Sequence, residues 1–395
     1  MKSSYFCYSM GFAFLYFAFG GVFPLISTYL EGIGFSGMQI GTVIASGTFL
    51  TLGAQPILGA ISDRVHNPKK VTLITIAIMI AICAVLSFNR NFAFIVVFYG
   101  LMIAMMNGVV PLTDNIALGS PHDYGKIRMW GSIGFAIAAQ IGGVIYEELT
   151  DKSMFILFII GMAITFMFFL TVTNPKVSVD EEKNKEKVPY KEIFSNVLKN
   201  KHYLLFLAVT FFMTGANETH LVYFGLLFKE MGGAPTALGT TFLLFTVSEI
   251  PFIFLADKII KRCGIRPIVI ATCAIYGARF MWYSTLPSPF IVQLTAVIQG
   301  ISLGLFIVSS VHVVGSLIEP KYRNTAMSLV AMMGLGLGAM VYQLLGGYLM
   351  DIYGAKAIYF VIGALSFVAL VIFLFIKIPD ENSRSQHVED VIEIK

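Results

Sequence analysis

Twelve apolar runs, each about as long as a membrane span, constrain this chain of 395 residues more than any other feature. A helix needs about 20 mostly apolar residues to cross the hydrocarbon core of a bilayer. Because 57% of the residues are hydrophobic and only 13% are charged, the chain lacks the polar surface of a soluble protein this long. The sequence therefore predicts an all-α membrane protein with twelve transmembrane helices. The runs cover residues 5–30, 38–61, 70–88, 92–117, 125–147, 153–174, 202–228, 236–258, 266–286, 289–318, 323–350 and 354–378.

Lysine and arginine are distributed unevenly between the two sides of these spans. If the N-terminus is cytoplasmic, 21 of the 27 basic residues lie on the cytoplasmic side and 4 on the other, while Arg128 and Arg279 lie inside spans. Basic residues accumulate in the cytoplasmic loops of membrane proteins. We therefore expect an integral protein of the plasma (inner) membrane with both termini in the cytoplasm.

The longest polar segment divides the spans six and six. Its first part, residues 177–188, is rich in charge, and its second part, residues 189–201, has a helical face formed by Ile193, Phe194, Val197 and Leu198. Such a face is typical of an amphipathic helix that lies on the membrane surface. We predict an N-terminal six-helix bundle over residues 1–174, a cytoplasmic central loop over 175–201, a C-terminal six-helix bundle over 202–380 and a cytoplasmic tail over 381–395.

The two halves repeat certain features. The loop after the second span contains Gly59, Asp63 and Arg64, and the loop after the eighth begins with Asp257 beside a lysine. The fifth and eleventh spans are both rich in glycine, which lets helices approach closely. Repeated halves of six helices are typical of transporters that bind their solute between the halves, near the middle of the membrane.

Together these features resemble the major facilitator superfamily. The resemblance is carried by the twelve spans, the central cytoplasmic loop, and the loop motif of Gly59, Asp63, Arg64 and Lys70. It implies two six-helix bundles that rock about a central site to give alternating access. It also implies that the loop residues Gly59, Asp63 and Arg64, with Asp257 in the second half, take part in gating.

Five strongly charged residues lie inside the predicted spans, namely Asp114, Arg128, Glu218, Glu249 and Arg279. A charge at membrane depth is costly and by default marks a functional site. Each residue also has a structural interpretation. The first two lie near span ends and can reach the interface, the glutamates can form hydrogen bonds between helices, and the last arginine can extend toward the membrane surface.

The stretch from Pro111 to Phe135 resembles more narrowly the lactose permease group, which includes oligosaccharide, phenylpropionate and nucleoside symporters. The matching residues are the Pro-x-x-Asp sequence that ends in Asp114 and the following YGKIRMWGSIGF, which contains Arg128. The resemblance implies that Asp114 and Arg128 contact the substrate. Phe135 stands where the lactose permease has the tryptophan that stacks on the sugar, and a phenylalanine can also stack.

The resemblance also assigns residues of the second half. Arg279 aligns with the arginine that couples proton to solute, and Tyr276, Trp282 and Tyr283 are expected on its face of the helix. A guanidinium among aromatic rings can form cation–π contacts. Gln299 and Ser302 stand where the group has titratable residues, so we predict that Gln299 contacts substrate instead.

A coupled proton must then use another group. Glu218 and Glu249 are the available acids within spans, and we predict that they take part in proton coupling with Arg279. His220 and His312 also lie within spans, and we include His312 among the coupling candidates. For either histidine the structural alternative is a neutral, hydrogen-bonded residue.

We expect a secondary transporter that moves a small polar solute (a sugar, nucleoside or aromatic acid) by alternating access with proton symport. A proton-coupled drug efflux antiporter and an uncoupled facilitator remain open. The sequence has no phosphate-binding loop, metal-ligand spacing or nucleophile motif. We therefore predict no enzyme activity, no cofactor and no metal. The expected partners are the solute, protons and the lipid bilayer, without nucleic acid, and we expect a monomer.

Overall fold

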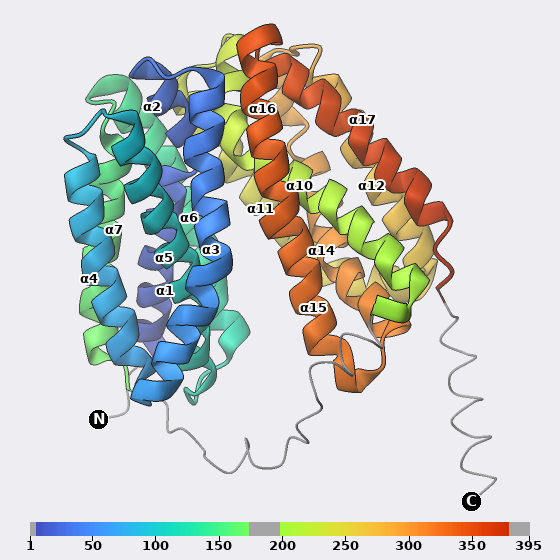
Figure 1. Cartoon of the computed structure of the whole chain (residues 1–395), viewed down its shortest axis with the longest axis horizontal. Helices are drawn as coiled ribbons and strands as arrows, with labels where there is room; N and C mark the ends of the chain where they lie inside the picture. Colours follow the sequence, from blue (N-terminus) through green and yellow to red (C-terminus); the bar gives the residue numbers. More distant parts are fainter. Residues whose placement is uncertain (1–4, 174–197, 379–395) are drawn as a thin grey trace, which may run out of the picture.

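The computed structural model describes residues 5–173 and 198–378. The first half contributes six membrane spans, and the first of these is divided into two helices (Figure 1). The central loop, most of the predicted amphipathic helix at 189–201 and the C-terminal tail fall largely outside the described residues. The helices of this half are α1 (Tyr5–Val22), α2 (Ile26–Gly32), α3 (Gly37–Val65), α4 (Pro68–Leu86), α5 (Phe92–Leu118), α6 (Tyr124–Glu148) and α7 (Ser153–Thr171).

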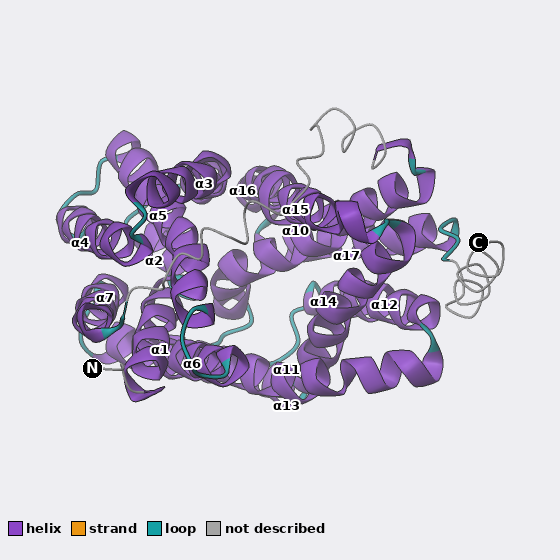
Figure 2. Cartoon of the chain, turned by 90° about the horizontal axis from the view of Figure 1, so that it is seen from below, coloured by secondary structure: helices purple, strands orange, loops and turns teal. Residues whose placement is uncertain are grey.

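The second half contributes six further spans, which Figure 2 shows beside the first six. Two of its spans are built from more than one helical segment. Its elements are α10 (Lys201–Glu230), α11 (Pro235–Cys263), α12 (Ile265–Tyr283), α13 (Pro289–Leu294), α14 (Val297–Leu317), the 3₁₀ turn η1 (Pro320–Tyr322), α15 (Arg323–Ala331), the π-helix η2 (Met332–Gly338), α16 (Ala339–Tyr353) and α17 (Ala355–Leu374).

The predicted spans and the observed helices agree, and among the described residues every regular element is helical. Within the part of the chain that the structure describes, ten helical spans are long and apolar enough to cross a membrane by themselves. The other two, α10 and α12, carry buried polar residues, including His220 and Arg279, which lower their apolar content. The predicted all-α fold of two six-helix bundles is therefore confirmed.

Three spans depart from a regular α-helix. The first is interrupted next to Pro24, which cannot donate a backbone hydrogen bond, and the tenth is interrupted at Thr295 and Ala296. The eleventh contains the π-helix η2, whose sequence MMGLGLG is rich in glycine. π-Helical turns are rare and occur frequently at functional sites. At each departure the regular pattern of backbone hydrogen bonds between residues four apart is interrupted or changed.

The two halves contact each other at one end of the molecule, where α3 packs on α16 and α6 packs on α11. Glycines make this approach possible. A Cβ atom on Gly347 would overlap the carbonyl oxygen of Gly37, and one on Gly239 would overlap that of Ala139. We call this the closed end.

Carboxylates from each half cap helices of the other half at the closed end. Asp351, at the end of α16, accepts hydrogen bonds from the backbone N–H groups of Gly37 (2.5 Å) and Met38 (2.9 Å), which begin α3. Glu147, at the end of α6, accepts one from the N–H of Thr236 (3.0 Å), at the start of α11. A negative charge at a helix N-terminus is stabilising.

A third polar contact joins the halves here, because Lys229 forms an ion pair with Glu31 (2.7 Å). Toward the opposite end the two halves diverge (Figure 1). Asp63 and Arg64 are exposed there, and a Cβ atom on Gly59 would meet nothing within 4 Å. We call this the open end.

Candidate functional site

The charged pair predicted in the first half lies between α1, α5 and α6. Arg128 stacks its guanidinium on the ring of Tyr16, with Cζ 3.9 Å from the ring centroid. Asp114 is half-buried, its Oδ1 has no hydrogen-bond partner among the described residues, and Arg128 and Tyr124 lie within its electrostatic reach. The structure thus brings the two predicted residues into one cluster, without a direct ion pair between them among the described residues.

Phe135 lies seven residues beyond Arg128, which is two helical turns further along α6 and on the same face. Its ring is partly buried against the core of the first half. The backbone of α1 passes very close to it, since a Cβ atom on Gly20 would overlap the Phe135 carbonyl. Helix α6 therefore packs closely on α1 at the level of Phe135.

Arg279 is buried in the second half, with 3% of its surface exposed. Its Cζ lies 5.0 Å from the ring centroid of Tyr276, 4.5 Å from that of Phe280 and 5.7 Å from that of Tyr283. Trp282, expected on the same face, packs on Tyr283 instead (5.3 Å between centroids). None of the three guanidinium nitrogens has a hydrogen-bond partner among the described residues.

Glu249 on α11 lies beside Gln299 on α14 and within electrostatic reach of Arg279. The close approach of α11 and α14 places them there, because a Cβ atom on Gly300 would overlap the backbone of Ser248. Gln299 is only 4% exposed. The predicted residues Gln299 and Arg279 therefore both lie near Glu249; the first two are buried and Glu249 is partly buried.

Two polar residues of α10 border this group. His220 is 1% exposed, and its Nδ1 lies 2.9 Å from the hydroxyl of Tyr359. The Tyr276 hydroxyl donates to Oδ1 of Asn217 (3.4 Å). The histidine is thus a buried, hydrogen-bonded residue beside Arg279, whose charge reaches it.

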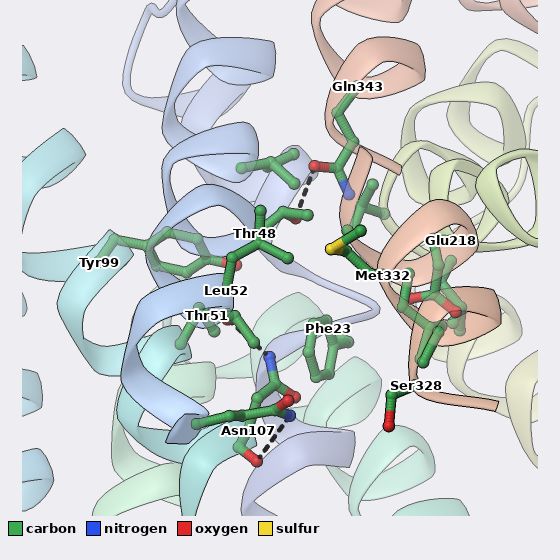
Figure 3. A pocket seen from close by; sticks show the side chains of 18 residues that line it. Phe23, Thr48, Thr51, Leu52, Tyr99, Asn107, Glu218, Ser328, Met332 and Gln343 are labelled. Carbon is green, nitrogen blue, oxygen red and sulfur yellow. Dashed lines mark hydrogen bonds between the residues drawn. The ribbon is translucent and has the colours of Figure 1, made fainter. Parts of the chain in front are cut away.

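Glu218 points elsewhere, into a cavity of about 430 Å³ between the two halves (Figure 3). Both halves supply hydroxyl and amide groups to its lining, and Thr48 donates to Oε1 of Gln343 (2.9 Å) across the interface. Among the residues that line the cavity, Glu218 is the one that the sequence analysis predicted. The polar lining residues are Thr48, Thr51, Gln55, Tyr99, Asn107, Glu218, Ser328 and Gln343.

His312 lies apart from Glu249, Arg279 and Gln299. Its Nε2 lies 2.9 Å from Oδ1 of Asp257, and it follows Gln299 by thirteen residues, or roughly 20 Å along α14. The Asp257 side chain is 70% exposed. The structure therefore joins one predicted coupling residue to one predicted gating residue near the open end.

Sequence reasoning missed most of the cavity lining. A signal was available, because Thr48, Thr51 and Gln55 follow an i, i+3, i+7 pattern, which is one helical face. Asn107 precedes Asp114 by seven residues and shares its face of α5. A polar stripe within an apolar span indicates a face that meets water or solute.

The comparisons with known proteins agree with this architecture. The model of the family described as "MFS_1 like family" matches residues 5–361. The chain belongs to this family. It is an integral membrane protein and a secondary transporter of a small polar solute, in a family of transporters rather than enzymes.

Relatives with known names cover nearly the whole chain. The maltose permease of Geobacillus stearothermophilus is 30% identical over 367 residues, which are 92% of each chain. The raffinose permease of Escherichia coli is 22% identical over 389 residues, or 92% of this chain and 90% of the relative. The crystal structure of the nucleoside transporter NupG superimposes with a TM-score of 0.82 at 18% identity, covering 94% of this chain and 98% of that one.

Proposed function

We propose that this protein imports a small polar solute, a sugar in the first instance, by proton symport and alternating access across the plasma membrane. The observation that carries the proposal is the cavity between the two halves, to which both halves contribute polar side chains. Contacts between the halves lie at the closed end. The sugar class is supported by the resemblance to the maltose and raffinose permeases.

The proposed orientation places the open end in the cytoplasm. Both ends of the described chain and most of the described lysine and arginine residues lie toward the open end, in agreement with the distribution of basic residues in membrane proteins. In this orientation the structure corresponds to the inward-facing state of a transport cycle. We propose that a monomer is the working unit, because the cavity is built within one chain.

The solute would meet the first half through Asp114, Arg128 and Phe135, which lie along adjoining faces of α5 and α6. Gln299 would supply an amide from the second half. Asp114 and Arg128 are near each other without a direct ion pair, so both keep hydrogen-bonding capacity for a solute hydroxyl. At the open end we propose a gating role for Gly59, Asp63, Arg64 and Asp257. His312, which is paired with Asp257, could link that gate to protonation.

Proton coupling would use Glu249 with Arg279. The guanidinium has no hydrogen-bonded acceptor among the described residues and stays within electrostatic reach of the carboxyl group. A small movement of α11 relative to α12 would bring the two into contact and favour release of a proton from Glu249. Glu218, which faces the cavity, would be the second protonatable group.

Uptake by purified protein in proteoliposomes tests this function. Labelled maltose, raffinose, uridine and 3-phenylpropionate would be supplied outside while the external pH is recorded. Symport predicts uptake of at least one solute, with alkalinisation of the outside when that solute is added. Equilibration without a pH change would instead show an uncoupled facilitator, and acidification of the outside would show an antiporter.

Replacing Arg128 with lysine is expected to raise the half-saturating solute concentration about tenfold or more. Lysine offers a point charge and cannot reproduce the planar, forked guanidinium that stacks on Tyr16. The measurement is initial uptake rate against solute concentration. Lys126→Ala, an exposed position on the same helix, is the control and should behave like the wild type. An unchanged concentration dependence for Arg128→Lys would limit that arginine to a structural role.

A further inference from the structure

The cavity of Figure 3 is bounded in the first half by α3 and α5, with Phe23 beside α1. In the second half α10 and the π-helical span bound it. Thr51 and Gln55 face it from α3 and Asn107 faces it from α5. Met332 and Gly336 of the π-helix η2 form part of the opposite wall. The cavity thus lies beside a span of the second half that leaves regular α-helical geometry.

The amide groups of this cavity use only part of their hydrogen-bonding capacity on the protein. Asn107 donates from its side-chain amide to the Thr51 hydroxyl (3.3 Å), and Gln55 donates to the backbone carbonyl of Asn107 (3.3 Å). The oxygens of both side chains have no donor among the described residues. Gln343 accepts from Thr48, and its amide nitrogen has no acceptor among them. The first half therefore offers acceptors and the second half a donor.

The charge of the lining selects against anions. Among the described residues that line the cavity, Glu218 is the one acidic residue, and none is a lysine or arginine. A carboxylate or phosphate group entering here would lose hydration without meeting a cation, which is costly in a site of limited polarity. An uncharged solute with hydroxyl groups avoids this cost and can satisfy both acceptors and donors.

The position of the cavity suits a solute on its transport path. Asn107 lies two turns, or about 10 Å, from Asp114 on the same face of α5, toward the closed end. The hydrogen bond between Thr48 and Gln343 joins the two halves beside the cavity. A solute held by Asn107 and Gln343 would therefore contact both halves at once, which is the requirement for coupling its binding to their movement.

We propose that Asn107, Gln55 and Gln343, with Glu218, form a binding site for an uncharged solute that carries neighbouring hydroxyl groups, as in a sugar or the ribose of a nucleoside. A side-chain amide both donates and accepts, so it can pair with two adjacent hydroxyl groups. The site is separate from Asp114, Arg128 and Gln299. This proposal rests on the proposed function, because it requires that the solute pass between the two halves.

The test uses the full chain in proteoliposomes with maltose, raffinose, uridine and 3-phenylpropionate as probes. The wild type is expected to take up at least one of the three hydroxyl-bearing probes and to leave 3-phenylpropionate outside. Asn107→Ala should raise the half-saturating concentration of that probe about tenfold, because two hydrogen bonds to solute would be lost. Alanine keeps α5 helical, so folding is preserved.

Asn115→Ala is the matched control. Asn115 lies on the same helix, is exposed, and makes no side-chain hydrogen bond among the described residues, so its replacement should change the half-saturating concentration less than twofold. Uptake of a hydroxyl-bearing probe that is equally strong in Asn107→Ala would overturn the site and leave the proposed function standing. Comparable uptake of 3-phenylpropionate would overturn the solute class. Uptake of none of the four probes would overturn the proposed function and the site together.

Discussion

Uphill solute uptake is expected to disappear when Glu249 is replaced by glutamine, while exchange of solute across the membrane continues. One proton driven by about 100 mV and one pH unit supplies about 3.7 kcal/mol, enough for a few-hundred-fold accumulation. Glutamine keeps the size and polarity of the side chain beside Gln299 but cannot carry the proton. The accumulation ratio should therefore fall to about one.

The measurement compares steady-state accumulation under an imposed proton gradient with equilibrium exchange at equal pH. Glu319→Gln, an exposed acid in the loop before η1, is the control and should accumulate solute normally. If Glu249→Gln accumulates solute as well as the wild type and Glu218→Gln does not, then the cavity carboxylate is the coupling group. Full accumulation by both variants would contradict the coupling that we propose in this half.

Removing the carboxylates that cap helices across the closed end is expected to shift the protein away from the closed arrangement about thirtyfold. Asp351 accepts two backbone hydrogen bonds from α3, and Glu147 accepts one from α11. Hydrogen bonds to charged groups and charges at helix N-termini are each stabilising, and their exposure to solvent reduces this to about 2 kcal/mol in total. The double variant Asp351→Ala, Glu147→Ala loses all three contacts, and these contacts exist only when the halves are joined at this end.

Spin-label distances can measure this shift. Labels at Arg90→Cys and Ser288→Cys, in a background without the four native cysteines, report the separation of the two halves at the closed end. The double variant should increase the population with the longer separation. Glu148→Ala is the control, because Glu148 adjoins Glu147 and is exposed but caps no helix among the described residues. An unchanged distance distribution in the double variant would show that glycine packing alone closes this end.

The two charged clusters could be predicted from the sequence more completely than the cavity. Helical spacing placed Tyr276, Trp282 and Tyr283 beside Arg279, and two of the three, Tyr276 and Tyr283, lie around its guanidinium. Phe280, which also contacts it, was not expected there, and Trp282 packs on Tyr283 instead. Asn107 and Gln343 could not be paired this way. They are uncharged, lie in different halves, and are brought near each other only by the packing of α3 on α16.

The hydrogen-bond partner of His312 also could not be predicted from the sequence. A histidine within an apolar run is expected to need a partner, but the sequence cannot say which one. Its partner, Asp257, is 55 residues away in sequence and stands on a neighbouring helix. The pair lies toward the open end because α11 and α14 run side by side in the same direction.

The sequence by itself determined the number, approximate extent and helical class of the membrane spans. The backbone N–H and C=O groups of a membrane span must form their hydrogen bonds within the protein, because the bilayer core offers none. A long apolar run meets this requirement by forming a helix. The tertiary structure alone decided which end is closed, which carboxylates cap helices of the other half, and which polar residues share the cavity. These properties depend on contacts between residues up to about 300 positions apart, such as Gly37 with Asp351, and no local pattern encodes the relative position of two helices at that separation.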